Sequence, residues 1–242
     1  MEVGIEAVGR KIKGLGLEIA THKTEAAWFH GLPRNKKPPE SWITVGEDRV
    51  CVGRHIKYLG LILDGRLDYK THFAQLAPRV EKAATSLGRL LPNERGPRLK
   101  VRRLYTSVIQ SMMLYGAPIW AGEEPMAREN VRALRGVQRR MALRAIRAYR
   151  TVSEEAALIL AGMVPFDFLA RAYAEAYWES RENKTQGREG ISGSDNPIEK
   201  AIRRARTRWK EELVRKGAAE RRVAGAVLPH WEQWWKSNPP EL

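Results

Sequence analysis

Cysteine is nearly absent from this sequence, and its scarcity excludes several classes of protein. The 242 residues contain one cysteine, Cys51, which cannot form an internal disulfide or supply a cysteine-based metal site alone. It lies in the apolar segment RVCVG, where we expect a small buried side chain within a strand. The five histidines are scattered, without a helical pair at metal-ligand spacing. We therefore expect no metal site.

Long apolar runs and the usual catalytic motifs are also missing. No apolar run reaches the roughly 18 residues needed to cross a bilayer, so we expect no membrane partner. The opening segment, MEVGIEAVGRKIKGLG, carries early acids and lacks the apolar block of a signal peptide. The sequence shows no Ser/His/Asp constellation and no glycine-rich loop with the Lys-Ser/Thr end of a P-loop.

Carboxylates do not gather in the way that metal-assisted phosphoryl transfer requires. That chemistry needs carboxylates held a few ångströms apart, whereas the acid pairs here fall in predicted turns or on helix surfaces. Asp64 and Asp68 flank a turn in LDGRLDY, and we interpret both as turn and capping residues. We therefore expect this chain to bind no cofactor.

Positive charge is what the sequence has in excess. Lys and Arg number 43 against 28 for Asp and Glu, which gives a formal charge of +15. Such a surplus repels itself and favours a polyanionic partner such as nucleic acid, with a generically basic protein as the alternative. Hydrophobic residues make up 43% of the chain, enough for a packed core.

The first 65 residues have the pattern of one helix followed by short strands. Residues 2–13 form a modest amphipathic helix that ends at Gly14 or Gly16. A turn, THKT, contains Lys23, and a hairpin is expected around Glu47 and Asp48. Strands are predicted at LGLEIA, EAAWF, WITVG, RVCVG and HIKYLGLILD.

From residue 71 the apolar period changes from 2 to 3.6, which predicts helices. They are expected over 71–91, 98–115, 126–149 and 166–181, and Ser153 is the predicted N-cap of a further helix. The fold class is therefore α+β, mostly helical, with a small antiparallel strand region. The predicted inward face of 98–115 consists of Val101, Leu104, Tyr105, Val108, Met112 and Tyr115.

The C-terminal part follows a polar break. Residues 182–197, ENKTQGREGISGSDNP, lack periodicity and predict a flexible linker, and a basic helix is expected over about 198–216. Trp231, Trp234 and Trp235 share one helical face. A core role is expected for them, whereas an exposed tail would point to an apolar protein partner.

The predicted helix 126–149 gives the strongest functional signal. The stretch from Asn130 to Val152 contains seven arginines and no acid. Phosphates would relieve the self-repulsion of such a stripe, and a solvated surface is the alternative. The predicted nucleic-acid contacts on this helix are Arg132, Arg135, Arg139, Arg140, Arg144 and Arg147.

The segment GPRLKVRRLY adds basic residues at a predicted helix start, where free backbone N–H groups also attract phosphates. Surface solvation is again the alternative. The residues predicted to contact nucleic acid here are Arg98, Lys100, Arg102 and Arg103.

Four segments occur in a recognisable order: LGLEIATHKTEAAWF, KYLGLILD, LYGAPIW and VQRRMALRAIRAYRTVSEEAALILAG. Together they resemble the reverse transcriptase of insect non-LTR retrotransposons, and the R1-like group of site-specific elements looks closest. The resemblance covers residues 1 to roughly 182. Its segments are specific in combination, whereas each alone is weak.

The resemblance implies roles for individual residues. Lys23 matches the palm position of a group that protonates the departing pyrophosphate, which fits the charge that develops in phosphoryl transfer. Tyr58, Leu59 and Gly60 match the primer grip, where Gly60 allows close approach to the primer backbone. The helices that follow match the thumb, which implies RNA or an RNA–DNA template–primer duplex as the partner.

This sequence also departs from that family. The catalytic aspartates, two of them in a Tyr-x-Asp-Asp hairpin, are missing, and one cysteine cannot form the family's zinc knuckle. We therefore expect a C-terminal fragment that does not extend primers alone, with Mg²⁺ bound only by the intact parent polymerase. The missing polymerase portion or another chain is a possible partner, and the parent class implies a nuclear location.

Resemblance and composition together predict five segments. They are a palm remnant with the primer-grip strand (1–68), a helical thumb (69–122), an Arg-rich helical connector (123–182), a flexible linker (183–197), and a basic helix with a Trp-rich tail (198–242).

An alternative function is a nucleic-acid-binding or structural remnant with no polymerase role. It would bind RNA or DNA backbone through its Arg-rich helices, with an affinity that depends on salt and not on sequence. Under the fragment interpretation, palm strands without their central partners leave an unpaired edge. We therefore expect residues 1–65 to be less stable than the helical part.

Overall fold

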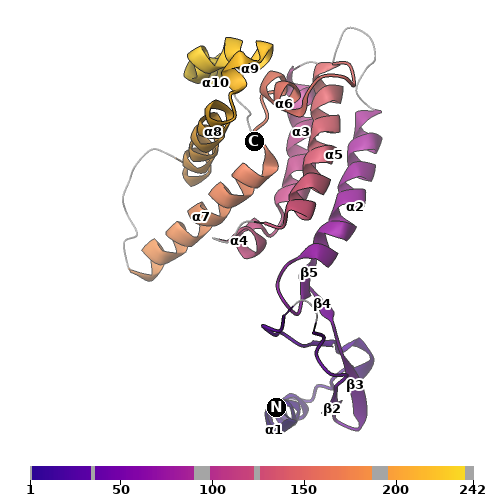
Figure 1. Cartoon of the computed structure of the whole chain (residues 1–242). Helices are drawn as coiled ribbons and strands as arrows, with labels where there is room; N and C mark the ends of the chain where they lie inside the picture. Colours follow the sequence, from indigo (N-terminus) through magenta and orange to yellow (C-terminus); the bar gives the residue numbers. More distant parts are fainter. Residues whose placement is uncertain (1, 34–35, 90–98, 123–125, 187–195, 238–242) are drawn as a thin grey trace. The chain divides into compact units, whose positions relative to one another are not determined.

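The computed structural model describes residues 2–33, 36–89, 99–122, 126–186 and 196–237. The chain divides into two compact units, Met1–His72 and Phe73–Leu242. Figure 1 traces both, from strands and a short helix in the first unit to helices throughout the second. The described elements are mostly helical with a small strand region, which confirms the predicted fold class.

The first unit contains helix α1, a three-stranded sheet and a separate hairpin. Strand β3 lies between β1 and β2, and β4 pairs with β5. The β2–β3 pairing is antiparallel and confirms the predicted hairpin, whereas β1 is parallel to β3. The elements are α1 (Glu2–Gly14), β1 (Ala26–Ala27), β2 (Trp42–Val45), β3 (Asp48–Gly53), β4 (His55–Tyr58) and β5 (Leu61–Asp64).

Three strand predictions in this unit are wrong in extent. LGLEIA forms no strand, because its alternating residues have no neighbouring strand to pair with; instead Ile19 lies against Gly9 of α1. EAAWF contributes only Ala26–Ala27 to the sheet. HIKYLGLILD is two strands, because Leu59 and Gly60 adopt positive φ angles of 46° and 85° and turn the chain back.

The prediction that Cys51 is buried is also wrong. Cys51 is free and exposed, and its neighbour across the β2–β3 ladder, Trp42, is 56% exposed. Successive side chains of a strand point to opposite faces of the sheet. The face that carries these two side chains is uncovered, whereas Val45 on β2 is buried.

The second unit is helical. Its core contains Val80, Ile109 and Leu134, each with no exposed surface. Ser153 caps α6 as predicted, since its Oγ accepts a hydrogen bond from the Ala156 N–H at 3.3 Å. The helices are α2 (Lys70–Gly88), α3 (Leu99–Leu114), α4 (Ala117–Trp120), α5 (Arg128–Ile146), α6 (Glu154–Ala161), α7 (Phe166–Thr185), α8 (Pro197–Arg215), α9 (Arg222–Val227) and α10 (Trp231–Ser237).

The predicted inward face of α3 is wrong at most positions. Tyr105 is buried, but Leu104 and Tyr115 are 65% and 56% exposed. The buried apolar positions that the prediction missed are Ile109 and Met113. The helix is apolar on two faces, so the sequence period alone could not indicate which face enters the core.

The tryptophan tail has the core role expected of it. Trp231 and Trp235 are 2% and 3% exposed, and both rings pack against Trp209 of α8. Trp234 donates from Nε1 to the Ile159 carbonyl of α6 at 3.2 Å. Most of the predicted linker, residues 187–195, lies outside the described residues.

Among the described residues, no single helix is long and apolar enough to cross a membrane. Helices α6 and α7 pass that test of length and composition only as a pair bent by 56°. Ala157, Leu158 and Phe166 in this pair are buried in the core.

Candidate nucleic-acid interface

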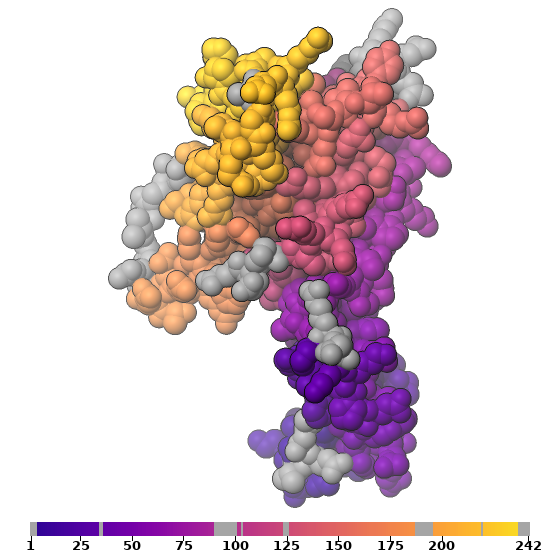
Figure 2. Space-filling model, viewed as in Figure 1, coloured from indigo at the N-terminus to yellow at the C-terminus, as the bar shows by residue number. Residues whose placement is uncertain are grey.

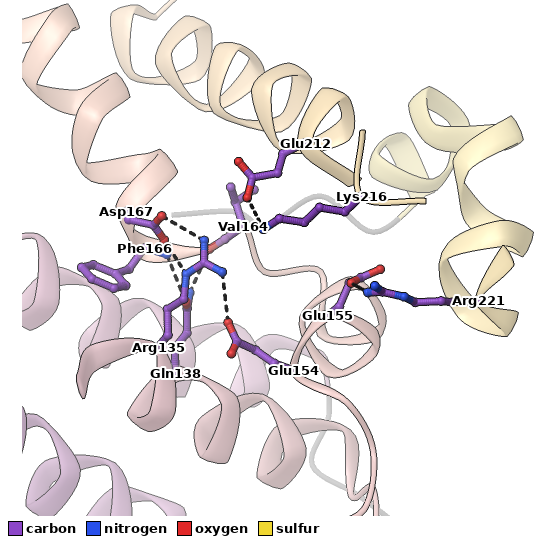
Figure 3. A network of polar contacts seen from close by, with 10 residues as sticks. All are labelled: Arg135, Gln138, Glu154, Glu155, Val164, Phe166, Asp167, Glu212, Lys216 and Arg221. Atoms are coloured by element: carbon purple, nitrogen blue, oxygen red, sulfur yellow. Dashed lines mark hydrogen bonds and ion pairs between the residues drawn. The ribbon is translucent and has the colours of Figure 1, made fainter. Parts of the chain in front are cut away.

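The arginines of α5 were predicted to form a stripe without compensating acids, and the structure supplies acids from other helices. Arg135 makes two hydrogen bonds of 2.9 Å to Asp167 of α7, from Nε and from Nη2. It also lies 3.4 Å from a carboxylate oxygen of Glu154 on α6. Figure 3 shows Arg135 between these two acids. Arg135 therefore joins three helices of the unit.

Burial and ion pairing shift the pKa values of this network in opposite directions. Burial alone would lower the pKa of Arg135, but the hydrogen bond and charge of Asp167 raise it above the ordinary value. Burial raises the pKa of the Glu154 carboxyl, and the nearby Arg135 charge opposes that rise. The Arg135 and Asp167 side chains are 24% and 21% exposed, so the pair is partly shielded from solvent.

A buried glutamine next to this pair holds the connection between α6 and α7. Gln138 is 0% exposed; its Nε2 donates to the Val164 carbonyl at 2.8 Å, and its Oε1 accepts from the Phe166 N–H at 3.0 Å. Both polar ends of the amide are thereby satisfied. Sequence reasoning missed this residue, because a glutamine among arginines on a helix is expected to be exposed to solvent.

Three further arginines of α5 also bind within the chain. Arg139 donates to the carbonyls of Arg150 and Val152 at 2.6 Å each. Arg140 pairs with Glu81 of α2 at 2.7 Å, and Arg144 donates to the Gly88 carbonyl at the end of α2. These contacts tie α5 to α2 and to the α5–α6 connection.

Arg132 of α5 and Arg147 just after it differ from these arginines. Arg132 is exposed, and no hydrogen bond or ion pair involves its side chain within the described part of the chain. Arg147 follows α5 with a positive φ of 56° and ends the helix in the left-handed conformation. Binding of nucleic acid by any of these arginines stays a prediction.

The second predicted basic group is only partly visible. Arg98 lies outside the described residues, and so do the side chains of Lys100 and Arg103. Arg102 is half-exposed and has an interaction partner of its own.

Helix α2 carries a basic row that sequence reasoning missed. Arg79, Lys82 and Arg89 are exposed and lie on one side of the helix, together with Gln75 and Ser86. Arg89 continues the helical geometry, because its N–H bonds the Thr85 carbonyl at 3.2 Å. Within the described residues no ion pair involves these three cations. Their spacing could have indicated the row, but polar positions on a helix have the pattern of any solvated face.

Arg89, at the end of the row, lines a hollow between α2, α3 and α5. The hollow has a volume of about 320 Å³, and Arg89, Arg140 and Arg144 line it, with Glu81 as the acid present. The Tyr105 hydroxyl, which donates to the Ala84 carbonyl at 3.2 Å, lies at its wall. Figure 2 shows atoms of α2 next to atoms of α5 in the second unit. The hollow is open to solvent, and three arginines lie among apolar lining residues such as Val137 and Met141.

In the first unit, the predicted primer-grip residues lie at the turn of the β4–β5 hairpin. Tyr58 is 60% exposed and Leu59 is 73% exposed. Leu59 and Gly60 form the two-residue turn, in which a left-handed conformation is costly for leucine and natural for glycine. The hairpin therefore presents two large apolar side chains to solvent.

Lys23 ends a short 3₁₀ turn, Thr21–Lys23, and its side chain is exposed. No hydrogen bond or ion pair of this side chain occurs within the described residues. Its N–H bonds the Ala20 carbonyl at 3.0 Å. The structure thus leaves the ammonium group accessible, and its predicted catalytic role is untested.

Asp64 and Asp68 have the turn and capping roles expected of them. The Asp64 carboxylate accepts hydrogen bonds from the N–H groups of Arg66, Asp68 and Tyr69, at 2.7 to 3.2 Å. Asp68 accepts from the Lys70 N–H at 3.0 Å, at the start of α2. These contacts shape the loop between β5 and α2.

Comparison with known proteins gives one relevant relative. The chain is 30% identical over 145 residues to a Drosophila melanogaster protein described as the "115 kDa protein in type-1 retrotransposable element R1DM". The match covers 59% of this chain and 14% of that protein, so the chain corresponds to a small part of its relative. The chain is therefore related to a retrotransposon protein. No family model and no solved structure matches it.

Proposed function

We propose that this chain is part of a retroelement reverse transcriptase and binds the phosphate backbone of a template–primer duplex. Contact is made through the α2 row, Arg79, Lys82 and Arg89, with Arg140 and Arg144 of α5 beside it. The observation that carries the proposal is the exposure of the three α2 cations without an ion-pair partner among the described residues.

The geometry of the row suits a phosphate backbone. A helix rises 1.5 Å per residue, so Arg79 and Arg89 lie about 15 Å apart along the axis. One strand of a duplex carries a phosphate about every 3.4 Å of its axis, so the row spans roughly four phosphates. Arginine forks also match the geometry of phosphate oxygens.

Two further features support a reverse transcriptase origin. The relative is a retrotransposon protein, and the order of segments resembles the end of the palm, the thumb and the helices beyond it. On this proposal Tyr58, Leu59 and Gly60 approach the primer, and Lys23 serves as the proton donor to pyrophosphate in the intact polymerase. The exposed hairpin turn is compatible with such a contact.

The test compares two triple variants that lower the net charge equally. The first replaces Arg79, Lys82 and Arg89 by alanine. The control replaces Lys184, Lys200 and Lys236, which are exposed on α7, α8 and α10. Affinity for a short RNA–DNA hybrid is measured by fluorescence anisotropy, and folding is checked by circular dichroism.

We expect the α2 variant to bind about 100-fold more weakly at about 0.15 M salt, because each lost phosphate contact removes a factor of roughly five. The control should change affinity by less than about threefold. Equal losses in the two variants would mean that only net charge matters, and the α2 surface would then have no special role.

A further inference from the structure

Helix α3 is apolar on two faces, and only one of them is buried in the part of the unit that the structure describes. Tyr105, Ile109 and Met113 are at most 5% exposed. Another face carries Val101 at 42%, Leu104 at 65%, Val108 at 39% and Tyr115 at 56% exposed. We call these four residues the outer face. A helix that is apolar on most sides is normally buried on most sides.

The outer face does not suit a charged partner. Residues 104–122, LYTSVIQSMMLYGAPIWAG, contain no charged side chain. Phosphate recognition by this stretch would have only neutral groups to use, whereas protein surfaces that bind nucleic acid are strongly basic. An apolar protein surface is therefore the matching chemistry.

The serines of α3 do not prevent dry packing. Ser111 lies on the outer face, and its hydroxyl donates to the Val108 carbonyl at 2.8 Å. Ser107, beside that face, donates to the Leu104 carbonyl at 3.0 Å. Both donors are satisfied within the helix, so burial against a partner would leave neither hydroxyl donor unpaired.

Exposed apolar side chains also occur on neighbouring helices of the unit. Ile119 of α4 is 52% exposed. Trp178 of α7 donates from Nε1 to the Pro118 carbonyl at 3.1 Å and is 43% exposed. The indole is therefore held in place beside α4. Exposed apolar patches of this kind mark interaction sites.

We infer that the outer face binds the α3 helix of a second copy of this chain, antiparallel and about a two-fold axis at Val108. The spacing of Val101, Leu104, Val108 and Tyr115 follows the three- and four-residue alternation of paired helices. With Val108 on the axis, Val101 faces the partner's Tyr115 and Leu104 faces the partner's Met112. A small side chain thus meets a large one at the ends of the contact.

The charges of α3 favour the antiparallel arrangement over the parallel one. Basic residues occur in its first turns, at Lys100, Arg102 and Arg103. A parallel pair would bring these like charges together. The antiparallel pair brings this basic end of the helix to the partner's C-terminal end, where positive charge is stabilising.

The self-association is weak and strengthens with salt. The outer face lies on one 16-residue helix, about 24 Å long. One face of such a helix offers less area than the roughly 800 Å² that each partner contributes to a standard interface. A charge of +15 on each copy adds repulsion that salt screens. We expect a dimer Kd in the range of about 1 to 100 µM at about 0.5 M salt. Nucleic-acid binding weakens with salt, so the failures of the two proposals are distinguishable.

Sedimentation equilibrium of the full chain tests the inference. Val108→Glu places two carboxylates opposite each other on the axis and should raise the dimer Kd at least about 30-fold. Val214→Glu is the matched control, because Val214 is 57% exposed on α8, and should leave the Kd unchanged. A chain that stays monomeric at about 100 µM overturns the inference. So does a dimer that Val108→Glu leaves intact.

Cross-linking tests the antiparallel geometry separately. In a Cys51→Ser background, Val108→Cys should form an intermolecular disulfide on mild oxidation. A Val101→Cys chain should cross-link to a Tyr115→Cys chain far faster than to itself. Faster self-cross-linking of Val101→Cys would mean a parallel pair and overturn the proposed arrangement.

Discussion

Replacing Arg135 should show whether this residue stabilises the fold or makes the phosphate contact predicted from the sequence. In the structure its guanidinium makes two hydrogen bonds to Asp167 and an ion pair with Glu154. Arg135→Met keeps much of the side-chain length and apolar stem but removes the charge. Asp167 and Glu154 then remain partly buried without their cation.

The expected loss follows from the burial of the pair. Removing one partner of a fully buried ion pair costs roughly 3–5 kcal/mol. Arg135 and Asp167 are 24% and 21% exposed, so solvent screens part of that cost. We expect Arg135→Met to destabilise the chain by about 2–4 kcal/mol. Adding Asp167→Leu to that variant removes the unpaired carboxylate and should recover about 1–3 kcal/mol.

Urea unfolding followed by circular dichroism measures these losses. The loss of unfolding free energy caused by Arg135→Met should be smaller near pH 4 than near pH 7. Burial already raises the pKa of Glu154 in the folded chain, and loss of the Arg135 charge raises it further. A raised carboxyl pKa favours the folded state at low pH, and that benefit is lost as pH rises through the folded pKa. Unchanged stability together with a large loss of hybrid binding would refute the structural role.

Three further outcomes are expected. Burial raises the pKa of Tyr173 to about 12, so the folded state loses stability as pH rises from about 10 to 12; Tyr173→Phe should reduce that loss by about 1–2 kcal/mol in urea unfolding, allowing for partial exposure. Amide hydrogens of residues 2–72 should exchange faster than those of the second unit, because few side chains in the first unit are buried; the reverse order in hydrogen exchange would count against this. Leu59→Asn should stabilise the hairpin by about 0.5–1 kcal/mol, because asparagine tolerates the left-handed turn; slower exchange of β4 and β5 amides would support it, and faster exchange would not.

The positions of helices were more predictable from this sequence than the buried face of each helix or the pairing of strands. The apolar period located α5 and α7, and Ser153 marked the start of α6, because these signals are local. For α3 the same period misassigned the core, since both Leu104 and Ile109 lie on apolar faces and only tertiary packing selects between them. The LGLEIA strand failed because alternation does not supply a pairing partner.

The candidate site was less predictable, because its electrostatics depends on contacts distant in sequence. Arg135 meets Asp167 across 32 residues, so a stripe that is free of acids along the chain is compensated in space. Conversely, the cations of α2, including Arg79 and Lys82, have the pattern of an ordinary solvated face. Their lack of an ion pair among the described residues emerged only from the structure.

The salt dependence of hybrid binding tests the central claim most directly. The slope of log K against log salt counts the phosphates that the protein neutralises, at about 0.9 for each contact in a duplex. Replacing Arg79, Lys82 and Arg89 by alanine should lower its magnitude by about 2 to 3, while the Lys184, Lys200 and Lys236 control changes it by less than about 0.5. An unchanged slope in the α2 variant would contradict phosphate binding by this helix.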